Sequence, residues 1–134
     1  MAARIRLRRV YDPDPGDGGP AFLVDRLWPR GVRKADLPME GWLKDVAPSE
    51  ELRKWYCHVP ELWEEFLERY GQELDGKPET WTPLLEAARR PAGVTLLYAA
   101  RDTERNNAVA LARYLEGRLQ DGPRLRSSGA PPQA

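Results

Sequence analysis

The sequence contains a single cysteine, Cys57, and a single histidine, His58, in 134 residues. One cysteine cannot form an internal disulfide, which suits a reducing compartment, so we expect a cytoplasmic protein. One histidine and one cysteine, without carboxylates at metal-ligand spacing, do not form a zinc-type site, and we expect no cofactor. No hydrophobic run approaches the ~20 residues that span a bilayer, and the basic N-terminus lacks the apolar core of a signal peptide. We therefore expect no membrane association.

Other motifs are absent as well, including a glycine-rich phosphate loop, a dinucleotide fingerprint and a nucleophile elbow. The 21 Lys and Arg residues balance 21 Asp and Glu residues, which argues against a protein that coats nucleic acid. The charge is nevertheless uneven, with a net charge of +4 over residues 1–34, −6 over residues 35–90 and +2 over residues 91–134. This distribution leaves room for one local basic patch. The sequence does not indicate an oligomeric state.

The length fits a single domain, which we expect to span residues 1–122 and to be followed by a disordered tail over residues 123–134. Apolar and alternating patterns predict strands at residues 4–10, 21–24, 41–44 and 93–100. Capping signals and apolar spacing predict helices that start at Ser49, at Pro60, at Thr82 and at Asp102 or Thr103, the first ending near His58.

The last predicted strand, residues 93–100, is continuously apolar, which is typical of a strand buried on both faces of a sheet. We therefore predict an α/β fold: a small single domain with a partly parallel central sheet of about four strands, flanked by helices on both faces.

Polar and charged residues follow three of the predicted strands. Asp25 and Arg26 open the first of these strand ends, and Asn106 and Asn107 follow the last one. Ligands of open α/β sheets bind beyond the carboxyl ends of the strands, and arginine grips phosphates and carboxylates with paired hydrogen bonds. We therefore predict a pocket for a small anionic or nucleotide-like ligand. Its candidate binding residues are Arg26, Trp28, Arg30, Lys44, Ser49 and Arg101.

Two carboxylates and the histidine are the candidate catalytic groups. Asp25 or Asp102, desolvated among cations and aromatic rings, could act as an acid or base, and His58 is the alternative proton carrier. The same charges also fit a purely structural network of ion-paired loop anchors. Trp28 and Trp42 could stack on a base or simply roof the sheet, and the roof is the favoured interpretation.

Two classes of function therefore remain open. One is an enzyme that acts on a small anionic ligand. The other is a non-catalytic binding or regulatory module that contacts nucleic acid or a protein partner, with nucleic acid the less favoured partner because the overall charge is balanced.

Several long motifs resemble a known family. They are Val24-Asp25-Arg26-Leu27-Trp28-Pro29-Arg30-Gly31, Trp42-Leu43-Lys44-Asp45-Val46-Ala47-Pro48-Ser49, Leu52-Arg53-Trp55 and Val94-Thr95-Leu96-Leu97-Tyr98-Ala99-Ala100-Arg101-Asp102. Together they resemble the bacterial YeaO-like proteins, domain of unknown function 488, over residues 4–118. The resemblance implies a small uncharacterised bacterial cytoplasmic α/β protein and no particular activity. In that family a histidine commonly stands near the position of His58, which supports His58 as a candidate site residue.

Overall fold

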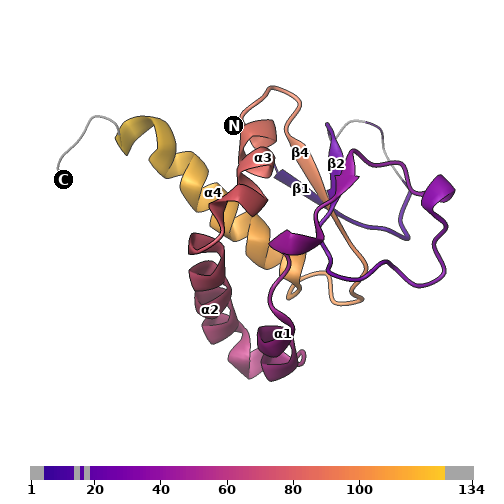
Figure 1. The fold of residues 1–134 in the computed structure, drawn as a ribbon, viewed down its shortest axis with the longest axis horizontal. Coiled ribbons are helices and arrows are strands. Elements are labelled where there is room, and N and C mark those ends of the chain that lie inside the picture. Colours follow the sequence, from indigo (N-terminus) through magenta and orange to yellow (C-terminus); the bar gives the residue numbers. More distant parts are fainter. Residues whose placement is uncertain (1–4, 14–15, 17–18, 126–134) are drawn as a thin grey trace.

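The computed structural model describes residues 5–13, 16 and 19–125, with residues 120–125 described by their backbone alone. A sheet lies beside a group of helices (Figure 1). The main elements are β1 (Ile5–Arg9), β2 (Ala21–Leu23), β3 (Gly41–Trp42), α1 (Glu50–Tyr56), α2 (Trp63–Asp75), α3 (Pro78–Ala88), β4 (Val94–Tyr98) and α4 (Asn107–Leu125). Short 3-10 turns occur at Lys34–Asp36, Lys44–Val46 and Pro60–Leu62. Helix α4 runs just beyond the predicted boundary at residue 122, and the rest of the predicted tail lies outside the described residues.

The four strands form one sheet in the order β1-β4-β2-β3, and every pairing between them is parallel. This confirms the predicted α/β class and shows a sheet that is parallel throughout its described strands rather than in part. Arg9 is in register with Tyr98, and Leu23 is in register with both Leu97 and Trp42. The carboxyl ends of all four strands therefore meet at one edge of the sheet.

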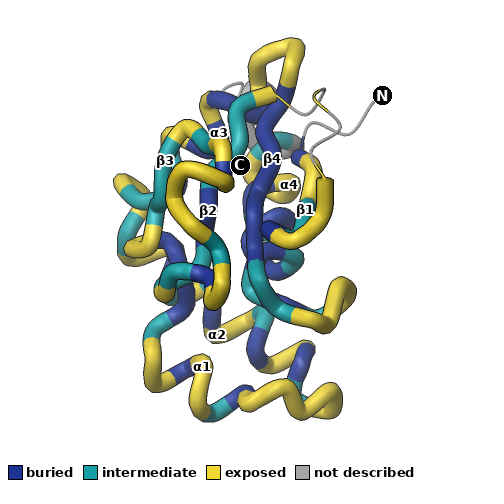
Figure 2. Tube along the Cα trace, turned by 90° about the vertical axis from the view of Figure 1, so that its right-hand side faces the viewer, coloured by how far each residue is buried: buried dark blue, intermediate teal, exposed yellow. Residues whose placement is uncertain are grey.

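Strand β4 is the centre of the fold, because it pairs with β1 on one side and with β2 on the other. All five of its residues are buried, as its continuously apolar sequence predicted, and Figure 2 shows it dark blue along its whole length. Leu96 faces the main core beneath helices α3 and α4, whereas Leu97 belongs to a smaller cluster on the opposite face. Within the described residues, no helix is both long and apolar enough to cross a bilayer.

The second face of the sheet is covered by the segment between β2 and β3 instead of by a helix, so the expectation of helices on both faces was wrong. Trp28, Leu37 and Trp42 pack there against Leu23 and Leu97. The two indole rings meet edge to face, with 5.4 Å between their centroids. This arrangement agrees with the favoured interpretation of the two tryptophans as a roof. A segment with little regular structure can cover a sheet in this way when large aromatic side chains supply the buried area.

The start of α1 agrees with the sequence pattern, since the Leu52 amide donates to Ser49 Oγ at 3.1 Å as expected of a helix cap. Three other helix starts differ. Helix α2 begins at Trp63, after a 3-10 turn that Pro60 opens. Helix α3 begins at Pro78, a favoured first position, and contains Pro83, beside which Thr82 Oγ1 donates back to the Pro78 carbonyl. Helix α4 is capped by Asn106, whose Oδ1 accepts from the Val109 amide, and not by Asp102 or Thr103.

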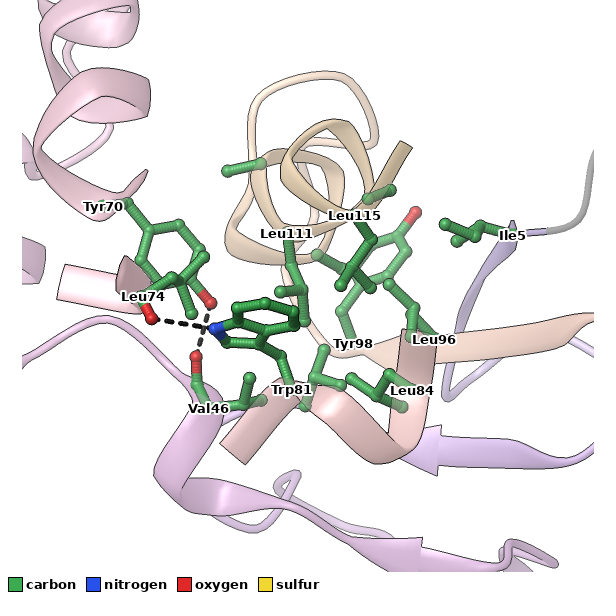
Figure 3. Packing of buried hydrophobic residues seen from close by; sticks show 14 of the residues in the cluster. Ile5, Val46, Tyr70, Leu74, Trp81, Leu84, Leu96, Tyr98, Leu111 and Leu115 are labelled. Carbon is green, nitrogen blue, oxygen red and sulfur yellow. Dashed lines mark hydrogen bonds between the residues drawn. The ribbon is translucent and has the colours of Figure 1, made fainter. Parts of the chain in front are cut away.

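Tyr70 and Trp81 carry buried polar groups that the core has to satisfy. The Tyr70 hydroxyl donates to the Val46 carbonyl at 2.6 Å, and Trp81 Nε1 donates to the Leu74 carbonyl at 2.8 Å (Figure 3). Tyr70 is 1% exposed, and complete burial raises the pKa of its hydroxyl. Because Val46 lies in the segment that connects β3 to α1, Tyr70 fixes that segment onto the core.

We expect Tyr70→Phe to lower the free energy of unfolding by about 1–3 kcal/mol, because the Val46 carbonyl loses its donor in a site that water does not reach. Tyr114→Phe is the matched control, since the Tyr114 hydroxyl binds Asp75 at the surface, where water can replace it. Urea unfolding of both variants measures the difference. Equal losses of stability in the two variants would contradict the role assigned to the Tyr70 hydroxyl.

Candidate functional site

A cleft of about 500 Å³ lies beyond the carboxyl ends of β2 and β4. Its walls come from the loop after β2, the segment before α1, the end of α1, the end of β4 and the start of α4. This is the edge where parallel α/β sheets bind ligands, because loops from neighbouring strands diverge there. The lining residues are Tyr11, Asp25, Arg26, Leu27, Trp28, Pro29, Arg30, Ala47, Pro48, Arg53, Lys54, Tyr56, Cys57, His58, Phe66, Ala99, Ala100, Asn106 and Asn107.

Asp25 joins four elements at this cleft. Its Oδ2 accepts from the Ala99 amide at 2.9 Å, and its Oδ1 accepts from Asn107 Nδ2 at 3.0 Å. The same Asn107 nitrogen also donates to the Val24 carbonyl, and Trp42 Nε1 donates to the Asp25 carbonyl at 2.7 Å. Burial raises the pKa of the Asp25 carboxyl, and its two hydrogen bonds offset this only in part. The carboxylate therefore lies half-buried where β2, β3, β4 and α4 meet.

Arg26 holds one wall of the cleft in place. Its guanidinium donates to the Pro48 carbonyl at 3.2 Å and to the Ala47 carbonyl at 3.4 Å. From the other side, Lys77 Nζ donates to the carbonyls of Ala47 and Asp45 at 3.0 and 2.8 Å. Burial is the largest influence on Lys77 and lowers the pKa of its ammonium. These two cations donate to backbone oxygens that would otherwise lack these hydrogen bonds in a partly buried loop.

Three further cations line the cleft: Arg30, Arg53 and Lys54. Lys54 Nζ lies 3.5 Å from a Glu50 oxygen in an exposed pair, which water screens strongly. The guanidinium groups of Arg30 and Arg53 make no hydrogen bond or ion pair within the described part of the chain. They are therefore the two lining guanidinium groups that could engage a ligand without breaking an existing contact.

Aromatic side chains form much of the remaining wall, and they belong to Tyr11, Trp28, Tyr56 and Phe66. Tyr56 and Phe66 stack with 4.6 Å between ring centroids. Leu27 also lines the cleft and is 67% exposed. The cleft thus combines apolar walls with several cations, the usual composition of a small-molecule site.

Cys57 and His58 end helix α1 in an uncommon backbone conformation. Both are left-handed, with φ of 44° and 57°, and the Cys57 amide donates to the Arg53 carbonyl to close the helix. The helix therefore stops at Tyr56, earlier than predicted. Non-glycine residues adopt this region rarely, because the side chain crowds the backbone. The double turn brings His58 back to the cleft, with its ring centroid 6.0 Å from that of Tyr56.

The structure brings five of the nine predicted site residues together at the cleft: Asp25, Arg26, Trp28, Arg30 and His58. Lys44 and Ser49 do not line it. The Lys44 ammonium lies 5.2 Å from the centre of the Trp42 ring. Ser49 caps α1, and its hydroxyl and amide both donate to the carboxylate of Glu73.

Arg101 and Asp102 also lie outside the cleft lining, and both are exposed. The Asp102 carboxylate accepts from the amides of Glu104 and Arg105, which are the main causes of its lowered pKa. The charge of His58 contributes to the same shift, so these two candidates lie within electrostatic reach of each other. Asp102 thus stabilises the turn that precedes α4.

Sequence reasoning missed Arg53, Lys54 and the aromatic residues Tyr11, Tyr56 and Phe66. Arg53 and Lys54 follow the apolar Leu52 on a short helix, where charged residues normally face solvent. Only the reversal at Cys57 and His58 shows that this helix end borders the cleft. The only signal for them in the sequence was the position of Arg53 and Lys54 one helical turn before His58, which the family resemblance had already singled out.

Within the described residues, no cluster of three or more His, Cys, Asp or Glu side chains could hold a metal ion. The fold is a small parallel α/β domain with a cleft at the carboxyl edge of its sheet.

Residues 4–132 match the model of a family described as the inactive DUF488-N3 subclade, and the chain belongs to this DUF488 family. An uncharacterised protein of Mycobacterium tuberculosis, Rv3073c, is 44% identical over 118 residues, which cover 86% of this chain and 96% of the relative. The uncharacterised protein YeaO of Escherichia coli is 40% identical over 111 residues, which cover 83% of this chain and 96% of YeaO. No solved structure matches the chain significantly.

The pH dependence of stability tests the buried state of the Asp25 carboxyl. Its pKa is raised in the folded protein, so the folded state keeps this proton longer than the unfolded chain does. The resulting stabilisation is fully present below the ordinary carboxyl pKa of about 4 and is lost as pH rises through the folded value. We therefore expect the stability advantage of the wild type over Asp25→Asn to shrink as pH rises from ~4 toward neutrality.

Urea unfolding of both proteins across this range measures that difference, and Asp45→Asn, an exposed carboxylate outside the cleft lining, is the control. An advantage that stays constant or grows with pH would show that the carboxyl is not desolvated in the folded protein.

Proposed function

We propose that the cleft binds a small anionic molecule with an aromatic or apolar portion, and that the protein acts as a binding module rather than a catalyst. The observation that carries this proposal is the charge of the lining: four cationic side chains, from Arg26, Arg30, Arg53 and Lys54, against the single carboxylate of Asp25.

The guanidinium groups of Arg30 and Arg53 make no hydrogen bond or ion pair with other described residues, so they are the expected contacts for the anion. Arg30 and Arg53 come from different elements, the loop after β2 and the end of α1, and both line the cleft. Arginine binds phosphate or carboxylate oxygens through two parallel N–H donors, and apolar walls strengthen such contacts by excluding water. A phosphate or carboxylate bound by these two side chains would give each guanidinium an acceptor that the described residues do not provide.

The size and walls of the cleft fit a molecule larger than an inorganic ion. A volume of about 500 Å³ lies within the roughly 300–1,000 Å³ of small-molecule sites. Tyr11, Tyr56 and Phe66 offer ring faces and edges for an aromatic body. The cations are gathered around a concave site instead of spread over a flat surface, which favours a small ligand over nucleic acid.

A binding role is favoured over catalysis by the way Asp25 is used. Each of its two oxygens holds a part of the fold, the Ala99 amide and the Asn107 carboxamide. A carboxylate that braces the junction of strand and helix would disturb that junction if it exchanged protons during a reaction. The matching family is moreover described as an inactive subclade.

A second candidate, proton-transfer catalysis by Asp25, is favoured by one observation. Desolvation raises the pKa of its carboxyl, as in many catalytic acids and bases, and His58 lines the same cleft. Incubating each bound compound with the protein and following its conversion separates the two functions. Product that forms with the wild type and not with Asp25→Asn would favour the enzyme.

We expect the double variant R30A/R53A to bind phenyl phosphate at least tenfold more weakly than the wild type. Hydrogen bonds to charged groups contribute about 1.5–3 kcal/mol each, and removal of both guanidinium groups leaves the phosphate with fewer donors. Arg113→Ala is the matched control, because Arg113 is exposed on α4 and does not line the cleft.

Isothermal titration calorimetry measures the dissociation constants, and thermal unfolding without ligand verifies that both variants fold. Binding that is unchanged in a folded R30A/R53A variant, or lost equally in Arg113→Ala, would contradict an anion site between these two arginines.

A further inference from the structure

We infer that the ligand of this cleft carries an amino group in addition to its anion, and that this group docks on the acceptor pair formed by Asp25 and Asn107. The inference rests on the proposed function and adds the chemistry of the second half of the ligand. The cleft would then have two regions, one with cationic side chains for the anion and one with hydrogen-bond acceptors for the amino group.

The Asp25 carboxylate can accept more hydrogen bonds than the described residues give it. An ionised carboxylate can accept about four hydrogen bonds, and within the described residues Asp25 receives two, from the Ala99 amide and from Asn107. Both donors belong to the protein itself, and Asp25 also lines the cleft. Acceptor positions therefore remain on this half-buried carboxylate, and a donor that enters with the ligand can occupy them.

The hydrogen bonds of Asn107 fix the orientation of its carboxamide. Its Nδ2 donates to two acceptors, the Val24 carbonyl at 3.2 Å and Asp25 Oδ1 at 3.0 Å. Because both partners are oxygens that only accept, the nitrogen must face them, which uses both of its hydrogens. The Asn107 oxygen is left as an acceptor, and no described residue donates to it. Asp25 and Asn107 thus each carry an acceptor position that no described residue occupies, and both residues line the cleft.

Within the described part of the chain, no cation forms an ion pair with Asp25. The next residue, Arg26, directs its guanidinium to the carbonyls of Ala47 and Pro48, and no ion pair joins Asp25 to a cation of the described chain. The raised pKa of its carboxyl agrees with this, since burial dominates and no positive charge is among its causes. A ligand amine would supply the missing donor, and the missing charge when protonated.

Matched pairs of probes test the inference in the unmodified protein. The first pair is 4-aminophenyl phosphate and 4-methylphenyl phosphate, which differ only in an amino or methyl group of similar size. The second, longer pair is adenosine 5′-monophosphate and purine riboside 5′-monophosphate, which differ in the amino group of the ring. We expect the amino member of at least one pair to bind about tenfold or more tightly in calorimetry, with the methyl-bearing or unsubstituted member still bound through its phosphate.

The outcomes separate this inference from the proposed function. Amino and non-amino members that bind equally in both pairs would overturn the inference while leaving the anion site intact. Failure of all four compounds to bind would overturn both.

Asp25→Asn adds a second readout, the ratio of dissociation constants within a pair. The substitution replaces one acceptor oxygen by a donor, so we expect the ratio to fall toward one, whereas Asp45→Asn keeps the wild-type ratio. A folded Asp25→Asn variant with an undiminished amino preference would overturn the assignment to this carboxylate. If the variant does not fold, the comparison of probes in the wild type still decides the inference.

Discussion

The hydrogen bonds of the Asp25 carboxylate hold together the part of the molecule on which the cleft depends. β2 and β4 are neighbours in the sheet, but their chains part after Leu23 and Tyr98. The carboxylate spans this divergence by binding the Ala99 amide and the Asn107 carboxamide, which ties β2 to β4 and to the start of α4. Burial of a charge is unfavourable, so such a brace is stable only because each oxygen is hydrogen-bonded. Each oxygen receives one hydrogen bond from the described residues, and the further acceptor positions are the ones that we propose for the ligand.

The opposite wall is built on another principle, the binding of backbone carbonyls by cations and a buried hydroxyl. The segment between β3 and α1 has little regular structure, so its carbonyls have no strand partner. Arg26, Tyr70 and Lys77 together bind those of Asp45, Val46, Ala47 and Pro48. A loop fixed in this way can form a firm wall without being a helix or a strand. Arg26 is therefore partly a structural residue, which leaves Arg30 and Arg53 as the principal contacts for the anion that we propose.

The fold was predictable from the sequence because its main signals are local. The continuously apolar run at residues 93–100 indicates a central parallel strand, and the Ser49 cap fixes the start of α1. Asp25 and Arg30 could be found because the strand-end rule needs only the position of one strand. The roles of Arg53 and Asn107 depend instead on the path of the chain in space. The left-handed turn at Cys57 and the capping by Asn106 decide these roles, and neither has a reliable signal in a single sequence.

The central claim is that one cleft at the carboxyl edge of the sheet binds the anion and the amine of a single ligand. A titration of the ¹⁵N-labelled protein with 4-aminophenyl phosphate, followed by amide chemical shifts, tests it most directly. The account predicts the largest shifts at residues 25–30, 53–58, 99–100 and 106–107, which line the cleft from four segments. Residues 84–88 of α3, which lie outside the lining, should stay unchanged. Shifts centred away from these four segments, or confined to the cationic side alone, would contradict it.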